Sequence, residues 1–377
     1  MKLGWLLIAF GVADAAPKVK PPDAAALDDP KHSLDAVRKA IAAKHVRISW
    51  FGDSVTADDQ ITNGLRHRLQ AQIGDGGPGF LWGEAPHPYC QHRAAASVAS
   101  EEWTTHGIST TVPPDRLLGL GGSTETESGG TIRIAPAAQV GNVDLHYLAQ
   151  PHGGSLELVA DGKVVTKLDT QAADKKGMFF TAQLADPAKK LELRAKGRVR
   201  MFGIALENAT GAIVDNLGVV NATAKAMRNH DMEEHWRNQL AHRAPDLIVV
   251  MYGTNEAEWL AAKGQGMAEH EKLFGELLAN AKLAAPNAAC LVISPLDQLD
   301  WRDEKMPARE SVPAMVEAQH RAALANGCAF WDTFAWMGGK GSSATWYRQG
   351  LIVKDFQHPT SEGADRIAEA LYEGLTK

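Results

Sequence analysis

The chain has 377 residues, of which 45% are hydrophobic and 22% are charged, so it can bury a full hydrophobic core and is long enough for two domains. Its formal net charge is -6 and it has no long basic block, which excludes the electrostatic footprint of a nucleic-acid-binding protein. This net negative charge gives a polyanion no general attraction, so we expect a neutral substrate or one that is guided by local charges.

The N-terminus has the pattern of a secretory signal. Lys2 precedes an apolar run over 3–12, and the small residues of 13–16 then supply an A-x-A cleavage site. We therefore predict a signal peptide at 1–16 and an exported mature chain, periplasmic or extracellular. An uncleaved N-terminal anchor is the alternative, but the apolar run is short for a bilayer span, and no later segment is long enough either.

Helical and strand-like patterns then alternate along much of the chain. The first helix is expected at 34–43, with Ser33 as its cap. Strands are expected at 46–51, 212–216, 247–252, 289–295 and 329–332, and helices at 61–73, 224–242, 267–283, 313–325 and 361–375. This alternation predicts a parallel sheet covered on both faces, with ligands beyond the carboxyl ends of its strands.

The alternation is interrupted between about 74 and 208. Glycine and proline dominate the start of this region, and short β patterns follow, with Asp161-Gly162 as a hairpin signal. We predict an inserted β-sandwich or jelly-roll domain here.

The three cysteines allow more than one arrangement. Cys290 and Cys328 each begin an apolar strand-like run, so they are either buried thiols or, in an oxidising compartment, a disulfide pair. Cys90 is left over. No Cys/His spacing resembles a zinc site, and neither a metal nor a cofactor is predicted.

The stretch ISWFGDSVTADD, residues 48–59, ends an apolar run at Gly-Asp-Ser. It predicts a buried strand, a tight turn and the start of a helix, which displays Ser54 near free backbone amides. Ser54 is then either a nucleophile or a helix cap. Asp53 is expected to form the turn rather than to act as an acid.

Two further motifs follow other predicted strands. Asp355 and His358 are three residues apart before the last helix, a spacing that lets the carboxylate orient the imidazole as a general base. Asn255, in MYGTNEA, is placed to donate to an oxyanion together with the Ser54 amide. The alternatives are a turn-capping aspartate, a surface histidine and a turn asparagine.

These three motifs in this order resemble the SGNH/GDSL hydrolase superfamily: Gly52-Asp53-Ser54, Gly253-Thr254-Asn255 and Asp355-Phe356-Gln357-His358. The resemblance implies a flavodoxin-like three-layer α/β/α fold with a discontinuous hydrolase domain at 33–80 and 211–377. It also implies Ser54 as nucleophile, His358 as base and Asp355 as the residue that orients it.

A narrower resemblance is to bacterial peptidoglycan O-acetylesterases. It rests on the nucleophile block with LRHRLQAQIGDGGPGF, on a β insertion before the second block, and on YGTNEA. It implies a carbohydrate-binding-module-like domain at 95–208 and O-acetyl groups of cell-wall glycan as substrate.

One block departs from the family pattern. In NLGVVNATA the family often has Gly-x-x-Gly, whose later glycine lends an oxyanion amide, but here Asn221 occupies that position. Asparagine tolerates unusual backbone conformations less well than glycine but better than most residues. We predict that the Asn221 amide completes the oxyanion hole with Ser54 and Asn255, with Gly218 as the fallback.

The sequence therefore predicts a secreted serine esterase that removes O-acetyl groups from a wall polysaccharide, peptidoglycan by resemblance. A polysaccharide O-acetyltransferase with the same triad and a catalytically weak glycan-binding protein are the alternatives. Oligomeric state is left open. Most tryptophans are expected in the core. Five lie in loop-like contexts and are expected to pack rather than to contact ligand: Trp82, Trp103, Trp259, Trp301 and Trp346. Glu256 is expected to be solvated, and Asp297 and Asp300 to be ordinary loop residues.

Overall fold

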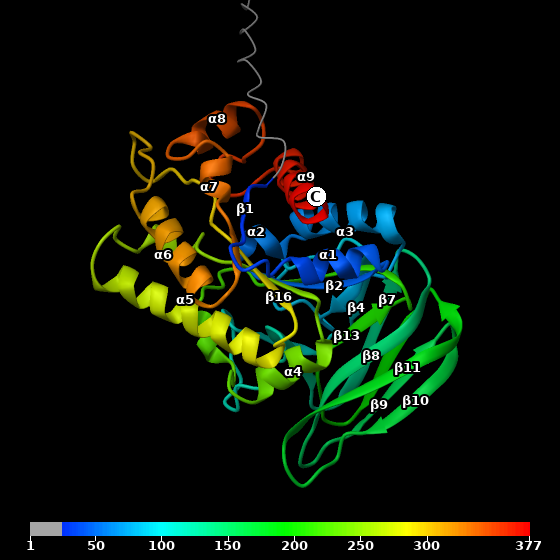
Figure 1. Cartoon of the computed structure of the whole chain (residues 1–377). Coiled ribbons are helices and arrows are strands. Elements are labelled where there is room, and N and C mark those ends of the chain that lie inside the picture. Colours follow the sequence, from blue (N-terminus) through cyan, green and yellow to red (C-terminus); the bar gives the residue numbers. More distant parts are fainter. Residues whose placement is uncertain (1–24) are drawn as a thin grey trace, which may run out of the picture.

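The computed structural model describes residues 25–377. The predicted signal peptide at 1–16 lies outside the described residues. Figure 1 shows helices on both sides of a central sheet, and a group of long β-strands beside this α/β part. The predicted fold class, a three-layer α/β/α arrangement with a β-sandwich, is confirmed.

The central sheet has the order β1-β17-β16-β15-β2-β14. Its strands from β17 to β14 are parallel, and the short edge strand β1 is antiparallel. Numbered along the chain from β2, the parallel strands follow the flavodoxin-like order 2-1-3-4-5. The bounds are β1 Leu27–Asp28, β2 His45–Gly52, β14 Gly211–Gly218, β15 Leu247–Met251, β16 Ala289–Ile293 and β17 Ala329–Trp331.

Helices cover both faces of this sheet because successive strand residues point to opposite sides. Ile48 and Trp50 belong to the apolar core under α1, α3 and α9, whereas Phe51 packs on Trp236 under α4, α5 and α6. The bounds are α1 Asp35–Ala42, α3 Gln60–Ile73 and α9 Ser361–Thr376 on one face, and α4 His235–Arg243, α5 Gln265–Ala284 and α6 Ser311–Ala325 on the other. The short helices are α2 Ser54–Ala57, α7 Thr333–Trp336 and α8 Ser342–Arg348, with 3-10 turns η1 Ala226–Asn229 and η2 Glu256–Glu258.

The β region consists of two antiparallel sheets that enclose their own apolar core. One sheet has the order β10-β9-β12-β7-β4 and the other β11-β8-β13-β6-β5, with β3 paired to β13. The division at 95–208 stays a prediction, as do the hydrolase bounds. The strands are β3 Gly79–Leu81, β4 Ala95–Ala99, β5 Thr104–Gly107, β6 Gly122–Thr126, β7 Gly129–Pro136, β8 Val140–Ala149, β9 Ser155–Ala160, β10 Lys163–Asp169, β11 Lys176–Ala188, β12 Leu191–Lys196 and β13 Val199–Glu207.

The helix predicted at 224–242 is wrong in its first half. In the first part of this range the structure has only the 3-10 turn η1, and α4 does not begin until His235. The Arg116 guanidinium donates to the carbonyls of Arg228, Asn229 and His230. These carbonyls are therefore satisfied by a distant side chain, and the chain leaves the helical conformation at His230.

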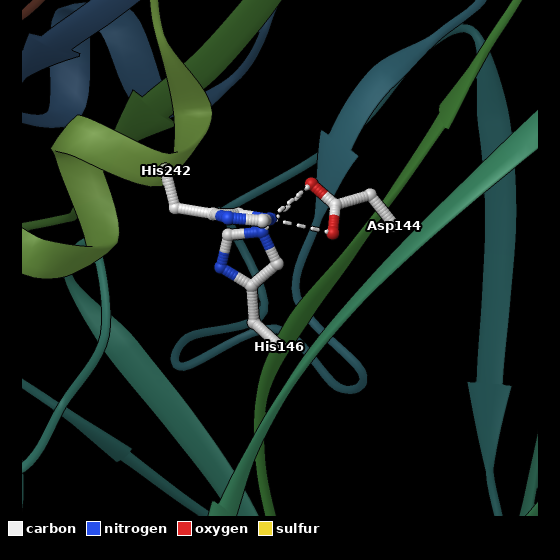
Figure 2. Close-up of side chains that lie close together, drawn as sticks. All are labelled: Asp144, His146 and His242. Atoms are coloured by element: carbon white, nitrogen blue, oxygen red, sulfur yellow. Dashed lines mark hydrogen bonds and ion pairs between the residues drawn. The ribbon is translucent and has the colours of Figure 1, made fainter. Parts of the chain in front are cut away.

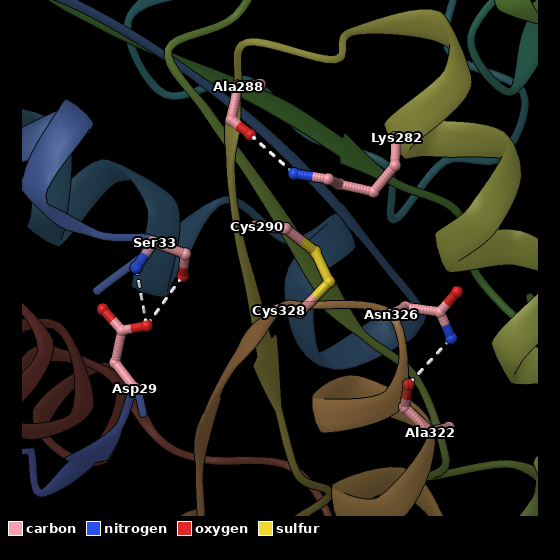
Figure 3. The surroundings of a disulfide bond; sticks show 8 residues. All are labelled: Asp29, Ser33, Lys282, Ala288, Cys290, Ala322, Asn326 and Cys328. Atoms are coloured by element: carbon pink, nitrogen blue, oxygen red, sulfur yellow. Dashed lines mark hydrogen bonds between the residues drawn. A yellow bond between two sulfur atoms is a disulfide. The ribbon is translucent and has the colours of Figure 1, made fainter. Parts of the chain in front are cut away.

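The cap predicted for the first helix is also wrong. The Ser33 hydroxyl donates to Asp29, and the Asp29 carboxylate accepts the backbone amides of Ser33 and Leu34 at 2.8 and 2.9 Å. Asp29 thus binds the two amides just before the helix, and α1 begins at Asp35 without a side-chain cap. Cys290 of β16 and Cys328, just before β17, form a disulfide (Figure 3). Cys90 is a buried free thiol. Of the two arrangements left open for this pair, the structure has the disulfide.

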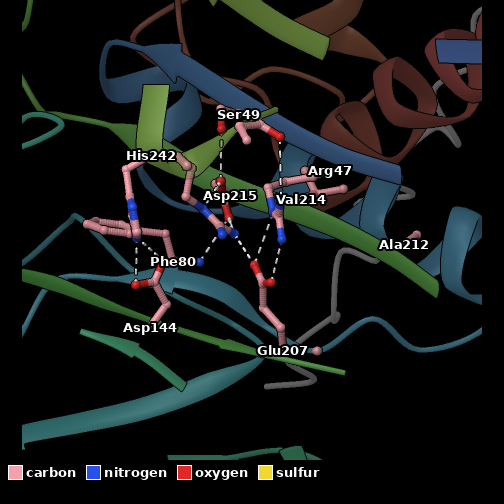
Figure 4. A network of polar contacts seen from close by, with 12 residues as sticks. Arg47, Ser49, Phe80, Asp144, Glu207, Ala212, Val214, Asp215 and His242 are labelled. Atoms are coloured by element: carbon pink, nitrogen blue, oxygen red, sulfur yellow. Dashed lines mark hydrogen bonds and ion pairs between the residues drawn. The ribbon is translucent and has the colours of Figure 1, made fainter. Parts of the chain in front are cut away.

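A buried ionic network fixes the amino end of the sheet (Figure 4). Arg243 of α4 bonds to Asp215 of β14 at 2.8 and 2.9 Å and also pairs with Glu207 of β13. Arg47 of β2 reaches Glu207 at 2.6 Å, and Ser49 donates to Asp215. Because Arg243 and Asp215 are almost fully buried, each charge depends on the other for compensation.

Candidate active site

The nucleophile turn follows directly from the Gly-Asp-Ser sequence. A Cβ at Gly52 would lie 2.1 Å from Thr56 Oγ1 and 2.9 Å from the Met251 carbonyl oxygen, so only glycine fits the end of β2. Asp53 caps α2, with its Oδ1 accepting the Val55 amide at 3.0 Å. Ser54 is therefore the first residue of a four-residue helix at the carboxyl edge of the sheet.

The side chains predicted from two distant segments meet at this edge. Ser54 Oγ lies 2.7 Å from His358 Nε2, and His358 Nδ1 lies 2.7 Å from Asp355 Oδ2. The other Asp355 oxygen accepts the backbone amides of Gln357 and His358 at 2.9 and 3.0 Å. The turn before α9 thus holds the carboxylate, which in turn holds the imidazole against the serine.

The electrostatics of this chain of hydrogen bonds favour a basic imidazole. Burial lowers the pKa of His358, but the hydrogen bond and charge of Asp355, with smaller contributions from Asp53 and Asp58, outweigh burial and raise it above its ordinary value. Burial raises the pKa of Asp355, but the His358 hydrogen bonds outweigh it and leave this pKa below the ordinary value. Asp355 is therefore ionised at neutral pH, as an orienting carboxylate must be.

The predicted oxyanion donors lie on two loops that are bonded to each other. Asn255 Nδ2 donates to the Ala222 carbonyl at 2.8 Å, which uses one of its two amide hydrogens. Asn221 has φ +61°, in the left-handed region where glycine is preferred and asparagine is tolerated. This conformation gives a physical reason for the family's glycine at the position.

Gly218, the fallback donor, has a different task. Its amide donates to Asn216 Oδ1 at 3.1 Å, and a Cβ there would lie 2.5 Å from the Ala57 amide nitrogen. The glycine lets β14 pack against the nucleophile helix. The Gly218 amide is therefore already bonded, and the Asn221 amide stays the predicted oxyanion donor.

Asp53 does more than form its turn. Its second carboxylate oxygen accepts the Thr254 amide at 3.1 Å, so a fully buried side chain ties the nucleophile block to the Gly-Thr-Asn block. Gln298 Nε2 donates to the Thr254 carbonyl at 3.1 Å from the loop after β16. No pattern near Gln298 in the sequence signals this contact, because it depends on packing between distant loops.

Glu256 contradicts the prediction of a solvated carboxylate. It is 4% exposed, and its Oε1 accepts the Ala224 amide at 2.9 Å. Burial without a cation raises the pKa of Glu256 to about 8, while burial lowers that of the neighbouring His270 to about 4. Both groups are therefore neutral near pH 7, and Glu256 acts as a buried hydrogen-bonding group behind Asn255.

Asp297 is likewise no ordinary loop residue. It is fully buried and accepts the Ser343 amide at 2.9 Å, which joins the loop after β16 to α8. Asp300, by contrast, lies on a loop and pairs with Arg309 at 3.2 Å.

The loop tryptophans divide into two groups. Trp82, Trp103 and Trp346 are buried as expected, but Trp259 and Trp301 are 62% and 50% exposed. Both exposed rings flank a bonded chain in which Gln357, next to His358, donates to Glu258, and Arg302 pairs with Glu258. These two rings are therefore not part of the core, and the expectation that they do not contact ligand stays a prediction.

Within residues 25–377, one group of histidine and acidic side chains is close enough to hold a metal ion: Asp144, His146 and His242. It lies away from the serine, on β8 and α4. The sequence did not reveal it, since His242 is 98 residues from Asp144. Among the described residues, no helix is long and apolar enough to cross a membrane.

Comparison with known proteins places this geometry in a family. Residues 181–366 match the GDSL-like lipase/acylhydrolase family. The matched range includes Asn221, Asn255, Asp355 and His358, and it starts after Ser54. The chain carries a GDSL-like acylhydrolase domain. It is accordingly an esterase of the SGNH type.

One solved structure in particular has the same fold as this chain. A peptidoglycan O-acetylesterase superimposes with a TM-score of 0.79 at 23% identity, over 93% of this chain and 97% of that chain. An acetyl-xylooligosaccharide esterase from Geobacillus Stearmophilus gives a TM-score of 0.33 at 17% identity, over 45% of this chain and 74% of that chain. No curated protein sequence matched the chain.

Proposed function

We propose that this GDSL-like acylhydrolase is an exported serine esterase that removes O-acetyl groups from a cell-wall glycan, peptidoglycan in particular. The observation that carries the proposal is the hydrogen-bond chain from Ser54 Oγ through the His358 ring to Asp355, with 2.7 Å at each step. A serine, a histidine and a carboxylate linked in this order perform acyl transfer on unrelated folds.

In the proposed mechanism, Ser54 Oγ attacks the ester carbonyl carbon while His358 Nε2 takes the hydroxyl proton. The amides of Ser54 and Asn221 and the free Asn255 hydrogen then stabilise the oxyanion, each donor contributing about 10²–10³-fold. His358 returns the proton to the sugar oxygen as the C–O bond breaks, which leaves an acetyl-Ser54 ester. Water gives a proton to His358 and attacks the carbonyl carbon of this ester. His358 then returns the proton to Ser54 Oγ as the bond from this oxygen to the acetyl carbon breaks and acetate is released.

Two further observations support the substrate class and the compartment. The structure of a peptidoglycan O-acetylesterase has the same fold over both the α/β and the β regions of this chain. The Cys290–Cys328 disulfide suits an oxidising compartment, in agreement with the signal sequence at the N-terminus.

Acetate release from O-acetylated peptidoglycan tests the proposal, with acetylated xylan as the competing substrate. The parent chain is expected to release acetate from peptidoglycan faster than from xylan. Ser54→Ala and His358→Ala should each lose at least about 10³-fold in kcat. Equal rates for the parent and both variants would refute the serine mechanism, and activity on xylan alone would refute the substrate.

The fate of the acetyl group separates an esterase from a transferase. With the parent chain, free acetate should account for the acetyl groups lost even when a non-acetylated glycan is added in excess. Transfer of labelled acetyl to that added glycan would instead establish the acyltransferase. Undiminished binding to wall material without turnover by the parent would establish a glycan-binding protein.

A further inference from the structure

We propose that Asp144, His146 and His242 bind one divalent transition-metal ion, with Zn²⁺ the best match, which joins the β-sandwich to helix α4. The three side chains converge in Figure 2: Asp144 and His146 project from the same face of β8, and His242 comes from the last turn of α4. Their ligand atoms all lie within 4.8 Å of one another.

The distances are close to those of a coordination sphere. His242 Nε2 lies 2.9 and 3.0 Å from the two Asp144 oxygens, and His146 Nε2 lies 3.2 Å from Asp144 Oδ2. Zinc bonds of about 2.0–2.2 Å in tetrahedral geometry separate the ligand atoms by roughly 3.4 Å. The three carboxylate–imidazole distances are therefore within about half an ångström of those in a tetrahedral zinc site.

The surroundings of His146 favour a cation at its Nε2. His146 is fully buried, and its Nδ1 lies 2.8 Å from Gln239 Oε1, an acceptor when Nδ1 carries a proton. Its Nε2 faces an Asp144 oxygen at 3.2 Å, a position that either a proton on Nε2 or a bound cation can fill. A hydrogen bond from the second ring nitrogen is also the usual means by which proteins orient a metal-bound histidine.

The remaining charges nearby compensate one another. Arg47 and Arg243 are paired with Glu207 and Asp215 in the ionic network of Figure 4. This leaves the Asp144 carboxylate as the anion that faces the ion, so that a divalent ion with these three ligands would keep a net charge of +1. Two neutral imidazoles and one carboxylate are the ligand set of zinc sites that keep an open position, as opposed to the oxygen-only sets that Mg²⁺ and Ca²⁺ prefer.

The cluster is both shielded and accessible. The Phe179 ring stacks on the His242 ring at 3.7 Å and meets the His146 ring edge-on at 4.8 Å, so an apolar wall covers one side. On the other side, Asp144 and His242 line a surface cavity of about 410 Å³. Water at this opening can occupy the fourth coordination position.

The ion would act on stability rather than on ester hydrolysis. The same cavity is lined by His45 and Arg47, at the amino end of β2, whereas Ser54 follows the carboxyl end of that strand. The five residue steps from Arg47 to Gly52 along β2 already span roughly 17 Å, and Ser54 lies beyond them. A metal ion coordinated by β8 and α4 at this distance would stabilise the contact between the β-sandwich and α4. It would not contact Ser54.

Zinc titration of the full chain after dialysis against a chelator tests the proposal by calorimetry and metal analysis. We expect one Zn²⁺ per chain, and a rise in Tm with Zn²⁺ that the chelator reverses and that Mg²⁺ does not produce. Asp144→Asn and His242→Gln should each weaken Zn²⁺ binding by at least about 10-fold. Far-UV circular dichroism in chelator checks that each variant is folded.

A matched control is His320→Gln. His320 Nε2 also contacts one aspartate, Asp28, at 2.6 Å, but on the exposed surface and without a third ligand. This variant should bind zinc as the parent does. Absence of stoichiometric zinc from the parent, or equal zinc affinity in the parent and both cluster variants, would overturn the proposal and identify the cluster as a proton-mediated contact. Because these readouts do not use turnover, they are independent of the proposed esterase function.

Discussion

The two edges of the central sheet use polar side chains in opposite ways. At the carboxyl edge, the side chains of His358 and Asp355, which are hydrogen-bonded in series with Ser54, are 36% and 39% exposed. At the amino edge, Arg243 and Asp215 are almost fully buried and compensated. Side chains at the first edge can still form hydrogen bonds to a substrate. Those at the second edge are already bonded to one another and hold the strands and α4 together.

The comparison explains why variants at the two edges should differ in what they change. Removing a group at the carboxyl edge removes a transition-state interaction and leaves little buried charge without a partner. Removing one at the amino edge leaves an uncompensated charge in the core, which costs folding free energy. Measurements of both activity and stability, on variants at each edge, therefore test whether the two edges differ in this way.

The largest effect is expected for Asp355→Asn. Loss of the anion that orients His358 should lower kcat by about 10²–10⁴-fold. Catalysis needs the neutral imidazole, so activity rises with pH through the pKa of His358, which Asp355 holds above its ordinary value. The inflection of the pH–rate profile, measured with a chromogenic acetate ester, should therefore move to lower pH in the variant. An unmoved inflection would contradict this role of Asp355.

Asp215→Ala should act on stability instead. It leaves Arg243 buried with Glu207 as its remaining partner, and we expect a loss of about 3–5 kcal/mol in the free energy of unfolding, measured by urea denaturation. The control is Asp186→Ala, which breaks the exposed Lys163–Asp186 pair and should change stability by less than about 1 kcal/mol. Similar losses in both variants would show that the amino edge is not specially stabilised.

Glu256→Gln sharpens the comparison, because Glu256 is a buried acid at the carboxyl edge without a compensating cation. Its pKa is raised from 4.5 to about 8 in the folded chain, so the parent loses stability as pH rises between these values. Asp215, whose folded pKa is lowered by Arg243, contributes stability above its unfolded pKa and loses it as pH falls through the folded one. At pH 8 the free energy of unfolding of Glu256→Gln should exceed that of the parent by on the order of 2 kcal/mol. Denaturation measured at several pH values should show that the stability of the variant depends less on pH than that of the parent.

The smallest effect is expected at Asn221. Asn221→Gly should keep full activity, because glycine adopts positive φ without strain. Asn221→Val should lose about 1–2 kcal/mol to backbone strain and several-fold in kcat, measured by urea denaturation and acetate release. Equal kinetics for the Gly and Val variants would mean that the backbone at this position does not position an oxyanion donor.

Much of the fold and the placement of the candidate site was predictable from local patterns. The apolar runs from β2 to β17 gave the parallel sheet, and each site motif follows directly in the chain from a strand end or precedes a helix. Glu256 was not predictable as buried, because its burial depends on the Ala224 amide and on α5. The Asp144–His146–His242 cluster was not predictable either, because β8 and α4 are distant in sequence.

By itself the sequence determined most strands and helices of the α/β part, the turn at Gly52, and which side chains follow the strand ends, since these depend on near neighbours. The tertiary structure alone decided which polar groups meet across long separations. Asp29 binds the amides of Ser33 and Leu34 before α1, and Arg116 donates to the carbonyls at the end of η1. Such pairings are set by packing, because a buried polar group takes whichever partner the fold brings within hydrogen-bond distance.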